Sequence, residues 1–261
     1  MQNNVDVNDF ANRVKKYYYS KALFCESLIN KKVNIQGNRV QMPPNDYDPL
    51  VNLYVEAYTL GCSIIDSLSS IWQALEPPKE KTKGNQHRFV SFLLHLNINQ
   101  NLERVSTPFL NYFLKKQKIE EHFRQEIINV YININDKWEG ESHRVYSDPR
   151  IDELKHIYED CHKKYSIPPN QTIKNIDSVF LQFRYAALIY KFYRCPFIHE
   201  FRASQYATFF NNRNEISVRE FTFTKFASGE YEPIQDVKPQ LDIGINLFTE
   251  SIRKGADIIY D

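Results

Sequence analysis

Residues 173–199 have the sequence IKNIDSVFLQFRYAALIYKFYRCPFIH, which gives the clearest indication of a helical fold. Over 173–193 apolar side chains return at helical spacing more regularly than anywhere else in the chain. The members of this series are Ile176, Val179 or Phe180, Phe183, Ala187 and Tyr190. The spacing predicts a helix from about Ile173 to Tyr193, which leads directly into Arg194.

Pro196 predicts that this helix ends near Tyr193. A proline inside a helix removes a hydrogen bond and clashes with the preceding turn, and it disfavours the helical conformation for Cys195. Proline is favoured at the first position of a helix. The sequence therefore predicts a break at Arg194 and a new helix that begins at Pro196, with His199 in its first turn.

The predicted helix start is expected to bind an anion such as phosphate. A helix N-terminus presents unpaired N–H groups and the positive end of the helix dipole. Arg194 would add a planar guanidinium that matches phosphate oxygens, and His199 would add a proton acceptor. Cleavage of RNA needs such a base for the 2′-hydroxyl and a cation for the charge that develops on phosphorus oxygens. We therefore interpret Arg194 and His199 as a candidate ribonuclease site.

Three further cations are candidates for binding RNA phosphates beside this site. Arg184, Lys191 and Arg194 are seven and three residues apart, so one helix is expected to present them on one face. Arg202 follows one to two turns later. The alternative is structural: Arg194 satisfies carbonyls at a helix end, His199 is hydrogen-bonded in the core, and the cations form a solvated face.

The rest of the chain predicts a mainly α fold in one domain, 1–261. A small β-hairpin is expected at 33–42, around Gly37-Asn38, and a short β element near the C-terminus at 217–226 with a Ser228-Gly229 turn. The expected helices span about 8–29, 49–75, 89–96, 108–130, 149–165 and 247–259, with an exposed loop at 76–86.

Composition and motifs exclude several classes of protein. Lys and Arg number 33 against 32 Asp and Glu, so any nucleic-acid site has to be local. No apolar run is long enough for a membrane helix, the four cysteines form no CxxC pair, and the chain opens with polar residues, so we expect a cytoplasmic protein with reduced thiols. No Walker, dinucleotide, HExxH or GxSxG motif occurs, and we expect no cofactor.

Two other groups of residues are weaker candidates for a functional site. His156 with Asp160, and His122 with Glu126, are helix half-sites for a metal, but neither has a second ligand cluster at a standard spacing, so no metal is expected. Cys195 with His199 would suit a cysteine hydrolase only if the two side chains face each other.

The segment YRCPFIHEFR, residues 193–202, resembles the Arg-x4-His motif of the HEPN superfamily. Residues 61–75, GCSIIDSLSSIWQAL, and 87–96, HRFVSFLLHL, are similar to earlier helices of such proteins. The resemblance would cover a core of roughly residues 50–212. The resemblance implies a helical bundle that dimerises, and a metal-independent RNase of bacterial defence or toxin–antitoxin systems, with an antitoxin or defence-system partner. It also implies that Arg194 and His199 are the catalytic pair.

Dimerisation would bring two such pairs to one cleft, so that one imidazole acts as base and the other as acid. The expected products are a 2′,3′-cyclic phosphate and a 5′-hydroxyl. The sequence departs from the motif at Cys195, where active members commonly carry Asn, Asp or His. This departure keeps two alternatives open, a non-catalytic module of the same ancestry that binds a partner protein or a nucleotide, and a helical scaffold without that ancestry.

Overall fold

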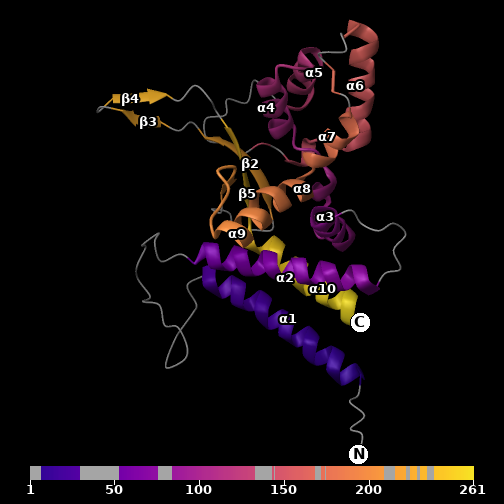
Figure 1. Ribbon diagram of the computed structural model, residues 1–261, viewed down its shortest axis with the longest axis vertical. Helices are drawn as coiled ribbons and strands as arrows, with labels where there is room; N and C mark the ends of the chain where they lie inside the picture. Colours follow the sequence, from indigo (N-terminus) through magenta and orange to yellow (C-terminus); the bar gives the residue numbers. More distant parts are fainter. Residues whose placement is uncertain are drawn as a thin grey trace, which may run out of the picture.

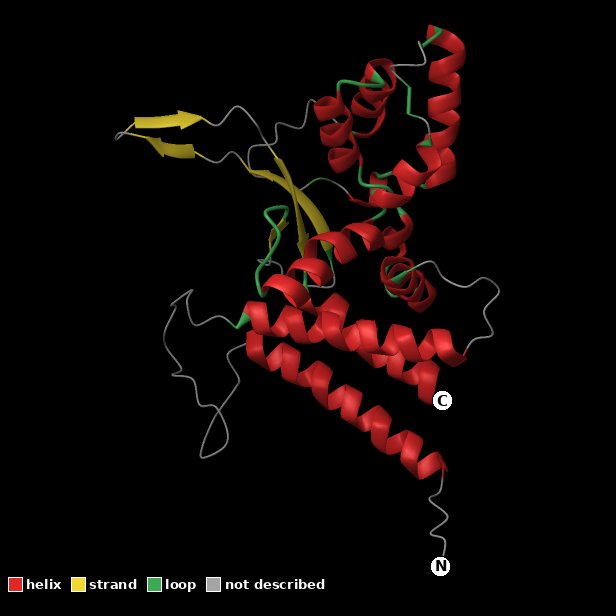
Figure 2. Cartoon of the chain, in the orientation of Figure 1, coloured by secondary structure: helices red, strands yellow, loops and turns green. Residues whose placement is uncertain are grey.

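Helices dominate the chain, as the apolar spacing predicts, and a small sheet lies near the C-terminus (Figure 2). The computed structural model describes residues 7–29, 53–75, 84–132, 143, 145–167, 172–173, 175–208, 215–221, 224–227, 230–233 and 238–261. The predicted hairpin at 33–42 and the predicted helix start at Pro49 lie outside the described residues. Within the described part, no helix is apolar over a length that would cross a membrane.

The helices and strands have the following bounds: α1 Val7–Ile29, α2 Tyr54–Leu75, α3 Asn85–Leu96, η2 Gln100–Glu103, α4 Thr107–Gln117, α5 Glu121–Tyr131, η3 Val145–Ser147, α6 Ile151–Tyr165, α7 Ile176–Gln182, α8 Tyr185–Ile189, η5 Tyr190–Arg194, α9 Cys195–Glu200, β1 Ala207–Thr208, β2 Ile216–Phe221, β3 Thr224–Ala227, β4 Glu230–Pro233, β5 Lys238–Ile243 and α10 Ile245–Tyr260.

Three long helices, α1, α2 and α10, pack side by side and form the base of the molecule (Figure 1). Apolar residues of α10 return at helical spacing, and Leu247, Phe248 and Ile252 are buried. Tyr58 of α2 is fully buried, with its ring centroid 5.2 Å from that of Phe248 and 5.6 Å from that of Phe197 in α9. This aromatic cluster joins α2, α9 and α10.

The small sheet has the order β1-β5-β2, with β5 parallel to β1 and antiparallel to β2. The strand β5 was not predicted. The predicted strand at 217–226 is divided between β2 and β3, and β3 forms an antiparallel hairpin with β4 that projects from the sheet (Figure 1). The hydroxyl of Tyr193 lies within hydrogen-bond distance of the carbonyls of Thr208 (2.5 Å) and Leu241 (2.8 Å), one of which takes its proton, and it accepts from the Ile243 amide (3.0 Å). It thereby anchors η5 to this sheet.

The helix predicted over 108–130 is wrong as a single element, because α4 and α5 are separate. Lys118 and Glu120 have φ values of 54° and 53°, which end one helix and start the next. The buried Glu120 carboxylate accepts hydrogen bonds from Tyr158 Oη (2.8 Å) and from the amide of Ile173 (2.9 Å). These distant partners hold the backbone out of the helical conformation that local spacing favours.

The helix predicted over 173–193 is also interrupted, at Phe183 and Arg184. Arg184 is extended, with φ −60° and ψ 144°. Its neighbours form backbone hydrogen bonds with another segment, from the Ser106 amide to the Phe183 carbonyl (2.9 Å) and from the Tyr185 amide to the Arg104 carbonyl (3.0 Å). Pairing with this segment replaces one turn of helix.

The break predicted at Pro196 is wrong, because the chain is helical on both sides of the proline. Arg194 (φ −57°, ψ −49°) and Cys195 (φ −65°, ψ −52°) are helical, and η5 is a π-helical turn in which the Cys195 amide donates to the Tyr190 carbonyl. We attribute the tolerance of Pro196 to this turn, whose bonds span five residues instead of four and displace the carbonyl that the ring would meet. The helix therefore does not present the open N-terminus that would have formed an anion site.

Candidate functional site

The side chains of Arg194 and His199 converge, although the predicted helix start is missing. Arg194 Nη1 lies 3.3 Å from His199 Nε2. Arg194 is 7% exposed, whereas the imidazole of His199 is exposed to solvent. Since Arg194 can only donate, the contact is a hydrogen bond when Nε2 is unprotonated.

Asp66 of α2 is a member of this cluster that sequence reasoning missed. Its Oδ2 lies 2.8 Å from Arg194 Nη2, and its Oδ1 lies 3.1 Å from Nη2 of Arg88 in α3. Nε of Arg88 also donates to Ser69 Oγ at 3.2 Å. One carboxylate thus joins two guanidiniums from different elements, and with a neutral His199 the cluster carries one net positive charge.

Apolar spacing does not predict this role of Asp66, because the residue lies on the polar side of a long amphipathic helix, which usually faces water. The available signal was the pair of segments 61–75 and 87–96, which contain Asp66 and Arg88 and which the HEPN resemblance already connected. Nothing local indicated that the Asp66 carboxylate would point at Arg194, 128 residues later.

The charge of Arg194 is secured by its surroundings. Burial alone would lower the pKa of its guanidinium, but the hydrogen bond and the charge of Asp66 outweigh burial and raise this pKa. The guanidinium carbon lies 5.2 Å from the ring centroid of Tyr190, a cation–π contact. Burial and the neighbouring Cys195 thiol raise the pKa of Tyr190, so its hydroxyl stays protonated at neutral pH. The cluster thus contains two guanidiniums, one carboxylate and one exposed histidine.

The guanidinium of Arg194 is almost fully engaged by the protein. Nη2 donates to Asp66, Nη1 contacts His199, and Nε is buried with no hydrogen-bond partner among the described residues. A phosphate oxygen would therefore reach the pair most readily from the side of the exposed His199. Such an oxygen would meet a hydrogen-bond donor and a base within one hydrogen-bond distance of each other.

The predicted basic track is not assembled as one helix face, because Arg184 precedes α8 in extended conformation. Ten residues of helix separate it from Arg194, about 15 Å at 1.5 Å per residue. Lys191 is exposed, with its Nζ 5.6 Å from the Phe192 ring centroid. Arg202 is exposed and pairs with Glu200 at 2.5 Å, at the edge of a hollow of about 510 Å³ beside α9.

The metal half-sites gain no third ligand, since the described residues contain no group of three or more His, Cys, Asp and Glu side chains suited to a metal. His156 Nδ1 lies 2.6 Å from the Asp152 carbonyl oxygen. The ring of His122 stacks on that of Tyr165 at a centroid distance of 4.1 Å.

In comparisons with known proteins, no family model, no curated protein and no solved structure matches this chain.

Proposed function

We propose that this protein is a metal-independent endoribonuclease of HEPN type that cleaves RNA at the Arg194–His199 pair, in a bacterial defence or toxin–antitoxin system. The observation that carries the proposal is the 3.3 Å approach of Arg194 Nη1 to Nε2 of an exposed His199. A guanidinium and an imidazole in this relation combine charge stabilisation with proton transfer.

The proposed reaction begins when the imidazole of His199 takes the proton of a ribose 2′-hydroxyl. The 2′-oxygen then forms a bond to phosphorus, and the bond from phosphorus to the 5′-oxygen breaks. Arg194 stabilises the negative charge on the non-bridging oxygens, and the leaving 5′-oxygen takes a proton. The products are a 2′,3′-cyclic phosphate and a 5′-hydroxyl.

A second imidazole would complete the reaction, because one histidine is not base and acid in the same step. We propose that a homodimer supplies it, with the second copy's His199 protonating the leaving oxygen. Asp66 would act as a positioning residue, since it holds Arg194 Nη2 and turns Nη1 toward the imidazole. Lys191 and Arg202, both exposed, would contact flanking phosphates.

The test is RNA cleavage by the purified full chain in EDTA, comparing wild type with Arg194→Ala and His199→Ala. Lys163→Ala is the control, because it removes an exposed cation on α6 that the proposed mechanism does not use. We expect both site variants to lose at least about a hundredfold in cleavage rate while Lys163→Ala retains most of it. Cleavage that persists in both folded site variants would remove the pair from the mechanism.

The second candidate function is a non-catalytic module that binds a partner protein or a nucleotide. It is favoured by the near-complete burial of Arg194 and by its ion pair with Asp66, which together suit a structural role. In that case Arg194→Ala lowers the melting temperature or dissociates the dimer, and wild type shows no EDTA-resistant cleavage. Thermal melts and light scattering on the same samples distinguish the two candidates.

A further inference from the structure

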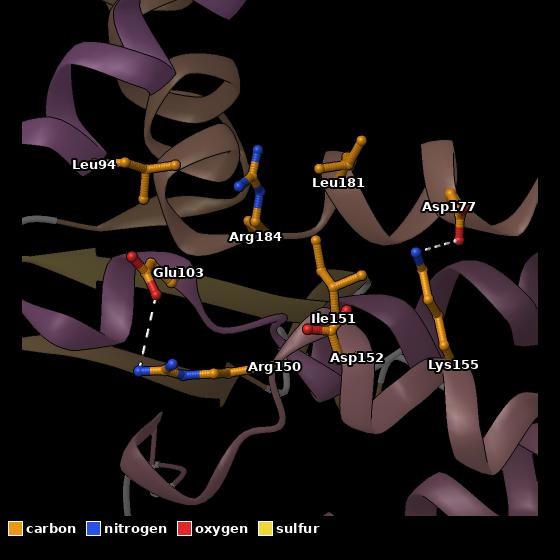
Figure 3. A pocket seen from close by; sticks show the side chains of 9 residues that line it. All are labelled: Leu94, Glu103, Arg150, Ile151, Asp152, Lys155, Asp177, Leu181 and Arg184. Carbon is orange, nitrogen blue, oxygen red and sulfur yellow. Dashed lines mark ion pairs between the residues drawn. The ribbon is translucent and has the colours of Figure 1, made fainter.

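A second hollow, of about 440 Å³, lies where α3, η2, α6 and α7 meet the start of α8 (Figure 3). Its volume is in the range of small-molecule sites, roughly 300–1,000 Å³. Three cations and three acids line it together with aliphatic side chains. It is separate from the Arg194–His199 pair, and nothing in the proposed ribonuclease reaction uses it.

Arg184 is the cation in this wall that has no ion-pair partner in the part of the chain that the structure describes. Arg150 lies 3.8 Å from Glu103, and Lys155 lies 3.2 Å from Asp177, as the dashed lines in Figure 3 mark. Within the described residues Arg184 makes no ion pair, and its Nε is buried without a hydrogen-bond partner. Burial lowers the pKa of this guanidinium, and the charge of Glu103, which raises it, offsets only part of this effect. A cation in this state is stabilised by an anion that enters the hollow.

The backbone holds Arg184 in place for such an anion. The residue lies between two backbone hydrogen bonds to the 104–106 segment, one at the Phe183 carbonyl (2.9 Å) and one at the Tyr185 amide (3.0 Å). Its own carbonyl accepts from the Leu188 amide at 2.9 Å. A guanidinium on a fixed backbone loses less conformational entropy when it binds, which favours affinity.

The other side chains that line the hollow determine which kind of anion fits it. Glu103, Asp152 and Asp177 balance the three cations, so the hollow has no excess positive charge for a dianion. Leu94 and Leu181 flank Arg184 on its two sides and offer an apolar surface (Figure 3). A monoanion with a short hydrocarbon chain matches both features, because its charge pairs with one guanidinium and its chain covers the leucines.

We propose that this hollow binds a small aliphatic carboxylate, with its carboxylate on the Arg184 guanidinium and its chain against Leu94 and Leu181.

The test is ligand-observed saturation-transfer NMR on the full chain, with 4-methylpentanoate as probe and its uncharged amide as control. We expect the carboxylate to bind with a dissociation constant in the millimolar range and the amide not to bind. Arg184→Gln is expected to weaken binding at least about tenfold, as for loss of a hydrogen-bonded charge. Arg202→Gln, which removes an exposed cation elsewhere, is expected to leave binding unchanged.

A second variant keeps the proposal testable if Arg184→Gln does not fold. Leu181 is 43% exposed, so Leu181→Glu places a competing carboxylate beside Arg184 without burying it, and we expect it to abolish binding. The proposal is overturned if the carboxylate does not bind wild type, if it binds Leu181→Glu equally well, or if inorganic phosphate binds more tightly and depends on Arg184. RNA cleavage by Arg184→Gln is a separate measurement, so failure here does not affect the ribonuclease proposal.

Discussion

Replacing Asp66 by Asn tests whether this carboxylate holds the candidate site together. The side chains of Asp66, Arg88 and Arg194 are 20%, 18% and 8% exposed, between a surface ion pair and a buried one. Removing one partner costs about 3–5 kcal/mol when the pair is fully buried and about 0–1 kcal/mol at the surface. We therefore expect Asp66→Asn to lower the free energy of unfolding by about 2 kcal/mol. For a chain of this length that corresponds to a melting temperature lower by about 4–8 °C.

The assay is urea and thermal unfolding, with Asp160→Asn as control. Asp160 pairs with Lys163 at 3.4 Å on the surface of α6, with both side chains at least 75% exposed, so no measurable change is expected there. A double-mutant cycle of Asp66→Asn with Arg194→Gln isolates the contact and should give a coupling of about 1 kcal/mol. Additive effects of the two substitutions, or a stability loss no larger than in the control, would refute the reasoning.

Two further predictions concern the core. Gly255→Ala places a Cβ 2.8 Å from the Phe92 ring and should lower the free energy of unfolding by about 1–3 kcal/mol in chemical unfolding. In the control Gly61→Ala the Cβ would lie 3.4 Å from its nearest neighbour, so this change should cost less or stabilise α2. Equal effects at the two positions would contradict the packing. Burial raises the pKa of Tyr58, Tyr185 and Tyr193 well above the ordinary value, so these tyrosines stay neutral in the folded chain. Their contribution to stability is therefore complete below about pH 10 and declines as the pH rises above it. Unfolding should accompany the absorbance change of tyrosinate, and ionisation of all tyrosines with the fold intact would disprove their burial.

Local apolar patterns were sufficient to predict a helix wherever that helix buries one of its faces. The apolar spacing predicted α1, α3, α6 and α10 at close to their observed bounds, because helical hydrogen bonds and side-chain periodicity are short-range properties. The approach of Arg194 to His199 was expected from a helix break that the structure does not have. Five positions are about 1.4 turns of α-helix, so helical spacing alone places the two residues on different faces, and the contact depends on the reach of the long Arg194 side chain.

Interactions along one stretch of chain set the helical class of this protein, and apolar spacing alone therefore predicts it. Long-range packing sets where helices are interrupted, which carboxylate holds Arg194, and that Arg184 faces a separate hollow. Asp66 and the 104–106 segment are far from their partners along the chain. No local periodicity encodes such contacts, because they form only when packing of the whole chain brings the partners together.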